Sequence, residues 1–262
     1  PLVVAVDEEG GYVTRVSRYP NFRDSKFLSP REYYETGGEE LLEKTEKEKA
    51  TLLLSIGVNL NLAPVADVSI NSNDFINNRT FNREAKETAV LIGKMVKYAN
   101  EVGISSSLKH FPGYGNNVDT HTGVAIDERS YENFLENDYL PFKEGIKNRA
   151  PTVLVSHNII NCIDSRYPAT LSKKVIAELR EKLNFSGVVI TDDLSMDAVN
   201  SYVEDGSAAV LAVNAGDDLI ITSDFVKMYR EVYQAVTDKK IDIKTIDQAV
   251  KRNIAWKIAY NM

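Results

Sequence analysis

Short, continuously apolar runs alternate with longer amphipathic segments along this chain, and this alternation constrains the fold more than any other feature. Six such runs occur, at residues 2–7, 60–65, 105–111, 152–157, 187–192 and 218–222. They are too short for helices, and most lack the polar alternation of a half-exposed strand. The sequence therefore predicts strands of a parallel sheet that is covered on both faces.

Helices are expected between these strands. Apolar residues recur at helical spacing in six segments, at residues 39–56, 84–102, 131–147, 172–183, 206–214 and 244–260. Ser172 and the pair Thr222–Ser223 are plausible helix N-caps. Repeated strand and helix pairs are typical of an α/β fold, either a doubly wound sheet or a (β/α)8 barrel. No linker or internal repeat interrupts the pattern, so residues 1–262 are expected to form one domain.

The ends of the predicted strands decide between these two architectures. Nearly every strand ends in, or is followed by, an ionisable residue, and these residues are Asp7, Asp67, Lys109, His110, His157, Asp192 and Asp193. A (β/α)8 barrel builds its active site at the carboxyl ends of its strands. The sequence therefore predicts a TIM-type barrel enzyme. Because only six strands are visible, we expect the first βα unit of the barrel to be missing from this chain.

Composition excludes several classes of protein. With 262 residues and 43% apolar residues, the chain can bury a sizeable core. A net charge of −7 without a basic stripe argues against a nucleic-acid partner. No apolar run approaches the roughly eighteen residues of a membrane span. The single cysteine, Cys162, rules out a disulfide within the chain.

The stretch KHFPGYGNNVDTHTG, residues 109–123, contains two of the three histidines. Its Pro and Gly residues turn the chain out of the preceding strand. Asp119 stands two residues before His121, so the carboxylate can orient the imidazole ring and raise its basicity. An isolated Asp-x-His is more often a turn former beside an exposed histidine. A catalytic pair here therefore depends on the other motifs.

A second stretch, FSGVVITDDLSM at residues 185–196, ends a predicted strand in two adjacent aspartates. Successive side chains of a strand point to opposite faces, so one carboxylate is expected to point into the barrel mouth and the other away. One of the two could cap a following helix. The inward carboxylate is a candidate nucleophile or metal ligand.

Together these motifs resemble the β-N-acetylhexosaminidase branch of glycoside hydrolase family 3. The resemblance extends from Leu2 to about Ile258 and is carried, in order, by VAVDEEGGYVTR, LNLAPVADV, NRTF, KHFPGYG, DTH, LVSHNI, YPATLS, GVVITDDLSM and LAVNAGDDLII. Tyr114 stands where the family usually has a second histidine, and Tyr12 where it usually has arginine. These departures leave the fine substrate preference open.

The resemblance implies a retaining mechanism. Asp192 would be the nucleophile that forms a covalent glycosyl–enzyme intermediate, and Asp193 a structural or capping neighbour. His121 would be the acid/base, with Asp119 as its orienting partner. Most retaining glycosidases use two carboxyl groups about 5 Å apart. An imidazole titrates near working pH, which suits a group that is acid in one step and base in the next.

The resemblance also implies a sugar site, lined by Asp7, Arg15, Arg79, Lys109, His110 and His157. The expected substrate is a terminal, non-reducing β-linked N-acetylglucosamine from peptidoglycan fragments or chitooligosaccharides, cleaved by exo attack. No cofactor and no metal are expected. Simpler roles remain open: a core histidine for His157, loop salt bridges for the two arginines, and solvated turn positions for Glu8 and Glu9. Asp67 is expected to bond nearby backbone and not the sugar.

Three other functions remain open. A phosphorylase could use phosphate in place of water on the same scaffold, because a histidine repels phosphate less than a carboxylate does. A metal-dependent hydrolase could use the three histidines and Asp192, although three histidines are few for such a site. A degenerate barrel could bind carbohydrate without cleaving it. We expect a bacterial protein, a monomer or weak dimer, whose compartment depends on a natural N-terminus that this sequence does not contain.

Overall fold

Six parallel strands form the central sheet of this protein. In a computed structural model, which describes residues 2–115, 125–196, 199, 202 and 207–262, the strand order is β1-β2-β3-β5-β7-β8. The strands are β1 (Ala5–Val6), β2 (Leu60–Asn61), β3 (Ser105–Phe111), β5 (Thr152–Val155), β7 (Val188–Asp193) and β8 (Leu219–Ile221). Each pair of neighbours is parallel. All six strands predicted from the apolar runs are therefore confirmed.

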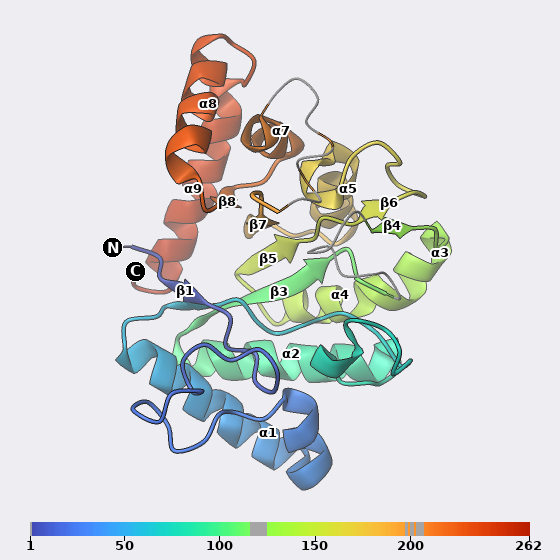
Figure 1. The fold of residues 1–262 in the computed structure, drawn as a ribbon, viewed down its shortest axis with the longest axis vertical. Helices are drawn as coiled ribbons and strands as arrows, with labels where there is room; N and C mark the ends of the chain where they lie inside the picture. Colours follow the sequence, from blue (N-terminus) through green and yellow to red (C-terminus); the bar gives the residue numbers. More distant parts are fainter. Residues whose placement is uncertain (1, 116–124, 197–198, 200–201, 203–206) are drawn as a thin grey trace.

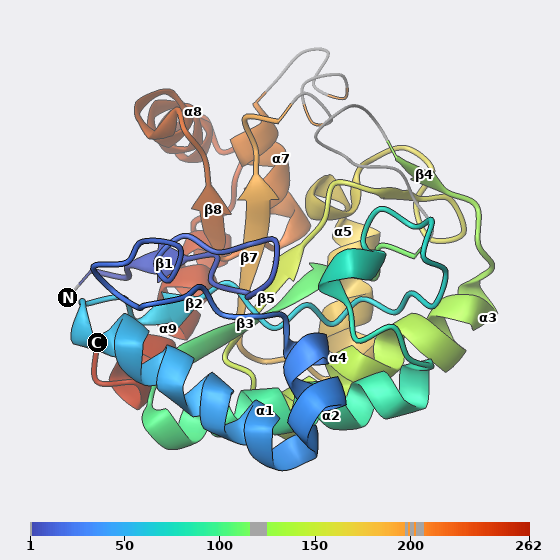
Figure 2. The same ribbon diagram turned by 60° about the horizontal axis from the view of Figure 1, so that its bottom comes forward.

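The sheet curls, and helices lie outside it (Figures 1 and 2). The described residues form a half-barrel in which β1 and β8 are the two edges. A closed barrel of eight strands is thus not observed in this part of the chain, and the missing first βα unit stays a prediction. A small second sheet, which the sequence did not predict, pairs β4 (Ile126–Asp127) with β6 (Ile159–Ile160).

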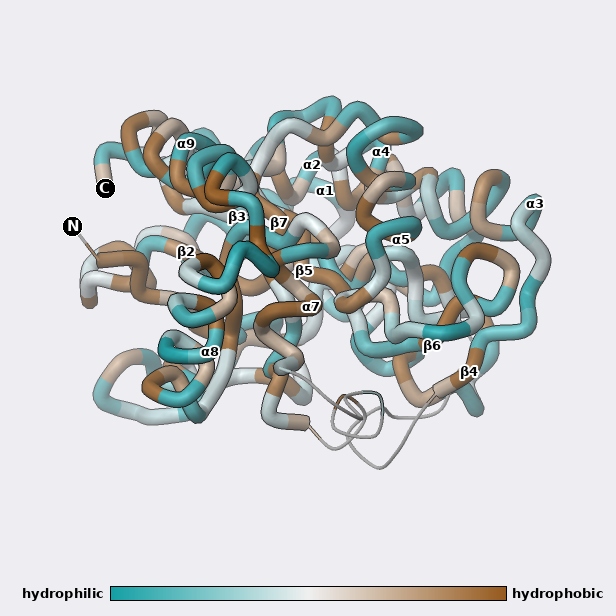
Figure 3. Tube along the Cα trace, turned by 90° about the horizontal axis from the view of Figure 1, so that it is seen from above, coloured by the Kyte–Doolittle hydropathy of each residue, from teal (hydrophilic) through white to brown (hydrophobic). Residues whose placement is uncertain are grey.

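Helices follow the strands along the chain, and they are α1 (Pro30–Ser55), α2 (Ala85–Val102), α3 (Tyr131–Asn133), α4 (Tyr139–Lys147), α5 (Lys173–Ala177), α7 (Ala208–Ala215), α8 (Phe225–Thr237) and α9 (Ile243–Ala259). Two π-helical turns, η2 (Phe134–Asp138) and η4 (Glu178–Lys182), continue α3 and α5. Short 3-10 turns lie at η1 (Asn77–Arg79) and η3 (Ala169–Leu171). The long surface helix α9 alternates hydrophobic and hydrophilic residues (Figure 3), as expected for a helix with one face on the sheet.

The start of one helix differs from the prediction, and the predicted cap of another is confirmed. Helix α1 begins at Pro30, behind a capping box of Ser29 and Glu32, and is kinked at Gly37 and Gly38. The two glycines hid this first part of the helix, because they are poor helix formers. Ser172 is confirmed as an N-cap, since its side chain accepts from the Val175 amide.

The sequence predicts a helix cap at Thr222–Ser223 but no helix after it, and the structure has helix α8 there. Asp224 is the N-cap, accepting from the Lys227 amide, and not Thr222–Ser223. The helix begins at Phe225, two residues after the predicted cap pair Thr222–Ser223.

Among the helices of the described residues, none has the length and the apolar composition of a membrane span.

The central strands are buried on both sides. One core cluster joins β3, β5 and β7 to helices α2 and α4, through residues such as Leu108, Val153 and Phe142. A second cluster places Trp256 of α9 against Leu60 of β2 and other strand residues. The Trp256 indole N–H donates to Ser105 Oγ at 2.8 Å, which satisfies a polar side chain at the start of β3. This packing holds the carboxyl ends of the strands at one edge.

Strand β8 is preceded by two carboxylates of different character. Asp218 pairs with Arg180 at 2.5 Å and with Arg252 at 2.8 Å. Asp217 is 2% exposed, and neither of its carboxylate oxygens has a hydrogen-bond partner within the described residues. Burial, and then the neighbouring charge of Asp218, raise the pKa of Asp217 well above its ordinary value. Asp217 therefore favours the neutral form in the folded protein.

We expect Asp217→Asn to raise the melting temperature at pH 8 by about 2–4 °C, roughly what 1 kcal/mol is worth in a domain of this size. A group whose pKa is raised by folding supports the fold below its unfolded pKa, and that support is lost as pH rises through the folded pKa. Asparagine is neutral at every pH, so its advantage should disappear below pH 4. Thermal melts between pH 3.5 and 8 measure this difference. A gain that is equal at both ends of the range would contradict the explanation.

Candidate active site

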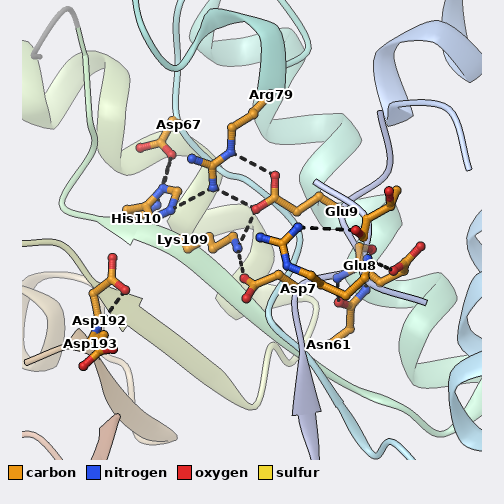
Figure 4. Close-up of polar contacts among 12 residues, drawn as sticks. Asp7, Glu8, Glu9, Asn61, Asp67, Arg79, Lys109, His110, Asp192 and Asp193 are labelled. Atoms are coloured by element: carbon orange, nitrogen blue, oxygen red, sulfur yellow. Dashed lines mark hydrogen bonds and ion pairs between the residues drawn. The ribbon is translucent and has the colours of Figure 1, made fainter. Parts of the chain in front are cut away.

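Charged side chains from three neighbouring strands converge at the carboxyl edge of the sheet (Figure 4). Asp7 and Glu9 follow β1, Asp67 follows β2, and Lys109 and His110 lie near the end of β3. Parallel strands place these ends side by side. Residues that are up to about one hundred positions apart in the chain therefore become direct partners.

Lys109 and Glu9 form the centre of a buried ion-pair network. Lys109 Nζ lies 2.7 Å from Asp7 Oδ1 and 2.6 Å from Glu9 Oε1. Arg79, from η1, approaches the same glutamate with two nitrogens: Nε lies 3.0 Å from Oε2, and Nη2 lies 2.8 Å from Oε1. This two-pronged geometry is the strong form of an arginine–carboxylate pair. The Glu9 carboxylate thus pairs with two cations, and Asp7 supplies the second negative charge of the network.

The network keeps its members charged. Burial alone would raise the pKa of Glu9, but the charges and hydrogen bonds of Lys109 and Arg79 lower it to about 2. Burial would likewise lower the pKa of Lys109, but Glu9 and Asp7 raise it above its ordinary value. The site therefore holds fixed charges at neutral pH.

His110 is held by Asp67 in a single orientation. Its Nδ1 lies 2.7 Å from Asp67 Oδ2, and its backbone amide donates to the same oxygen at 3.1 Å. Its Nε2 lies 3.1 Å from Nη2 of Arg79. A guanidinium can only donate, so Nε2 accepts and the proton resides on Nδ1. The arrangement fixes the ring tautomer.

Asp67 also binds the backbone beyond β3. Its Oδ1 accepts from the Tyr114 amide at 2.7 Å. Asp67 is therefore part of this network through His110, although the sequence predicted only a backbone contact. The backbone contact is confirmed, and the histidine contact was missed because β2 and β3 come together only in the fold.

Glu8 and Glu9 are not solvated turn residues, so that prediction is wrong. They are 0% and 4% exposed. The Glu8 carboxylate accepts from the backbone amides of Arg15, Val16 and Ser17, and so organises the loop after β1. Two acids at a strand end, followed by two glycines, was the signal for this role.

Arg15 lies apart from this network in its contacts. Arg15 is exposed, and its Nη1 donates to the Thr14 carbonyl at 3.3 Å. Within the described residues, none of its hydrogen bonds joins it to Lys109 or Glu9. The predicted sugar contact of Arg15 stays a prediction.

The two aspartates at the end of β7 point in opposite directions. Asp192 points toward His110 and Lys109, and Asp193 points away (Figure 4). The Asp193 carboxylate accepts from the Ser195 amide at 2.8 Å, which is a turn-forming contact. The alternation of side chains along a strand explains this division.

Asp192 is held as an anion. Its Oδ1 accepts from the Asp193 amide at 2.8 Å. Burial raises its pKa, but favourable electrostatic interactions with His157 and His110, followed by the hydrogen bond from the Asp193 amide and the charge of Lys109, lower it below its ordinary value. A carboxylate nucleophile must be ionised and partly accessible, and Asp192 meets both conditions.

His157, beyond β5, supports this strand end. It is 0% exposed, and its Nε2 lies 3.0 Å from the Asp193 carbonyl oxygen, to which it donates. The contact joins β5 to β7 behind the candidate nucleophile. A direct sugar contact for His157 stays a prediction.

Asp119 and His121 lie outside the described residues, so their predicted pairing has no structural account here. The metal-dependent alternative also has no complete structural account, because one of its four proposed ligands is His121. Among residues that the structure does describe, no group of three or more His, Cys, Asp or Glu side chains could hold a metal ion.

The charged network and the ionised carboxylate lie at the carboxyl edge of a curled parallel sheet, which is where barrel enzymes build their active sites. The family description "Glycosyl hydrolase family 3 N terminal domain" matches residues 1–255. The chain therefore belongs to glycosyl hydrolase family 3.

Individual relatives agree with this family. The chain is 31% identical over 236 residues to "Beta-hexosaminidase A" of Pseudoalteromonas piscicida, which covers 84% of the chain and 40% of that protein. It is 32% identical over 250 residues to "Beta-hexosaminidase" of Hydrogenovibrio crunogenus, covering 90% of the chain and 67% of the relative. The chain thus spans well under half of the first relative and about two thirds of the second.

Solved structures share the fold. A glycoside hydrolase family 3 β-N-acetylglucosaminidase from Paenibacillus sp. superimposes with a TM-score of 0.90 at 28% identity, covering 100% of this chain and 50% of that one. A family 3 glycosyl hydrolase from Mycobacterium smegmatis gives a TM-score of 0.86 at 28% identity, covering 98% of this chain and 82% of that one. The half-barrel is therefore similar to the corresponding part of these enzymes.

Proposed function

We propose that this chain carries the catalytic site of a retaining, exo-acting β-N-acetylglucosaminidase. The substrate would be a glycan with a terminal, non-reducing β-linked N-acetylglucosamine, such as a peptidoglycan fragment or a chitooligosaccharide. Two findings support the proposal: the family and the names of its relatives, and the geometry of the strand ends. The observation that carries it is the ionised Asp192, which faces the Lys109–Glu9 network across the mouth of the half-barrel.

The reaction would proceed in two displacements. In the first, Asp192 Oδ attacks the anomeric carbon, and the glycosidic oxygen leaves with a proton from His121. In the second, His121 takes a proton from water, and the resulting hydroxide displaces Asp192 from the anomeric carbon. Two inversions give net retention. Asp119 would hold the imidazole ring in the orientation that both steps need.

The network would bind the sugar through its accessible edge. The side chain of Asp7 is 37% exposed, whereas those of Lys109 and Glu9 are 3% and 5% exposed. Asp7 is therefore the acid best placed to accept hydrogen bonds from sugar hydroxyls. Lys109, with Glu9 behind it, would fix the position and charge of Asp7. Arg79 and His110 would complete the wall facing Asp192.

The proposal is tested by product analysis. Purified protein would be incubated with p-nitrophenyl β-N-acetylglucosaminide and, as a matched control, with the β-glucoside that lacks the acetamido group. We expect release from the first substrate only, and proton NMR should show the β-anomer as the first sugar product. Release of the α-anomer would contradict the double displacement. Sugar 1-phosphate formed in phosphate buffer would identify a phosphorylase on the same scaffold.

A further inference from the structure

We propose that Arg129 is a positioning residue for acid/base catalysis, because it fixes both ends of the segment 116–124 to one buried cluster. We define this anchor cluster as Asp127, Arg129 and Asp138. The inference rests on the proposed function, in which His121 of that segment is the acid/base. All the contacts that carry it lie in residues 113–115 and 125–138, on either side of the segment.

The chain that enters the segment lies directly on the anchor cluster. Gly113 and Gly115 have φ values of +132° and +55°, and a Cβ atom at these positions would lie 2.2 Å from Asp138 Oδ1 and 2.3 Å from Arg129 Cζ. The Gly113 carbonyl accepts from Arg129 Nη2 at 3.4 Å. Only a backbone without side chains fits against these groups. The entering strand end is thus seated on the Arg129 guanidinium.

The chain that leaves the segment is bound by the same guanidinium. Arg129 Nη2 lies 2.7 Å from Asp127 Oδ2, and Arg129 Nε lies 3.0 Å from both Asp127 oxygens. Strand β4, which contains Asp127, is held to β6 by the bonds of the Ile159 amide to Ala125 and of the Asn161 amide to Asp127. The exit is therefore tied to the β5–β6 connection that contains His157.

Asp138 is the third member of the anchor cluster and pairs with Arg129. Its Oδ2 lies 2.8 Å from Arg129 Nη1, and both acids are 1% exposed in their side chains, against 21% for Arg129. The planar guanidinium donates to two carboxylates and one carbonyl at fixed angles, which an ammonium cannot do. One side chain thereby sets the separation of the two ends of the segment. We infer that a fixed separation of these two described flanks is needed for acid/base catalysis by His121.

A leaving-group comparison distinguishes positioning from general structural support. The value of kcat/KM for a retaining glycosidase reports only the steps up to cleavage of the glycosidic bond. A 2,4-dinitrophenyl leaving group departs without protonation, whereas a phenyl leaving group needs the acid, whose contribution is typically 10²–10⁴-fold. If Arg129 positions the acid, Arg129→Lys should lower kcat/KM for the phenyl β-N-acetylglucosaminide by about 100-fold. The dinitrophenyl substrate should change by less than about 5-fold.

Two further variants complete the test. Gly115→Ala pushes the entering chain off Arg129 while leaving all the charges in place, so it should show the same contrast even if Arg129→Lys folds poorly. Arg180→Lys is the matched control, because Arg180 forms an ion pair of similar burial with Asp218 before β8. It should affect both substrates equally or neither.

The outcomes separate the inference from the function on which it rests. His121→Ala should show the full leaving-group contrast. If it does while Arg129→Lys and Gly115→Ala lower both substrates equally, or neither, the positioning role is overturned and the proposed function stands. If His121→Ala itself shows no contrast, the proposed acid/base is wrong and the inference fails with it.

Discussion

Asp192→Asn is expected to lower kcat/KM for p-nitrophenyl β-N-acetylglucosaminide by about 10⁴-fold or more. The amide retains the size of the side chain and can still accept from the Asp193 amide, but it is a very poor nucleophile. Loss of a covalent nucleophile is among the largest single effects in enzymes. Initial rates of p-nitrophenol release measure the effect, with circular dichroism melts to confirm an intact fold.

Asp193→Asn is the matched control for this prediction. The residue is adjacent and chemically identical, but its carboxylate accepts from the Ser195 amide and points away from the network. Asparagine can make the same contact, so activity should stay within about 10-fold of wild type. A larger loss in Asp193→Asn than in Asp192→Asn would exchange the roles of the two residues. Equal and small losses of activity in both variants would contradict a covalent mechanism through either aspartate.

Glu9→Gln is expected to lower the free energy of unfolding at pH 7 by about 3 kcal/mol. The folded-state pKa of Glu9 is about 2, against an ordinary value of 4.5. Each tenfold change in proton affinity corresponds to about 1.4 kcal/mol, which gives the estimate of about 3 kcal/mol. Glu9 is 4% exposed, so solvent does little to screen its two cationic partners.

The pH dependence of this loss follows from the sign of the shift. A group whose pKa is lowered by folding stabilises the protein above its unfolded pKa, and that stability is lost as pH falls through the folded value. The difference between wild type and Glu9→Gln should therefore be full above pH 5 and shrink toward pH 2. Urea unfolding at several pH values measures it. A difference that does not change with pH would contradict the ion-pair explanation.

Glu87→Gln provides the control for a surface ion pair. Glu87 lies 3.4 Å from Arg83, and its side chain is 64% exposed. Such pairs contribute about 0–1 kcal/mol, so this variant should unfold almost as wild type does at every pH. The contrast would show that burial, and not pairing alone, gives Glu9 its effect.

The strands were predictable because their signal is local. A strand buried on both faces needs a continuous apolar run, and VVI in β7 and VLV in β5 carry that signal without reference to any partner. Helix α8 was missed although Met228, Val232 and Ala235 recur at helical spacing and pack against buried residues, because exposed apolar side chains share the same segment. Phe225, Tyr229 and Tyr233 are 71%, 69% and 64% exposed. The two-residue strands β4 and β6 are too short to leave any periodic pattern.

The site was predictable only in part. The rule that functional groups stand at strand ends predicted Asp7, Lys109, His110 and Asp192 as site residues, and the structure brings them to one edge of the sheet. It could not assign Glu9, because whether an acid after a strand is solvated or paired depends on which strand lies beside it. The contact of Asp67 with His110 depends in the same way on the β2–β3 pairing.

The sequence by itself determined which residues stand at the end of each strand and the family to which their motifs belong. The tertiary structure decided which of these residues form ion pairs with one another. Lys109 and Glu9 are one hundred positions apart, and their 2.6 Å contact exists because the parallel strands β1 and β3, with β2 between them, end at one edge of the sheet. Electrostatic partners inside a protein are set by distance and burial, and neither is encoded in local sequence pattern.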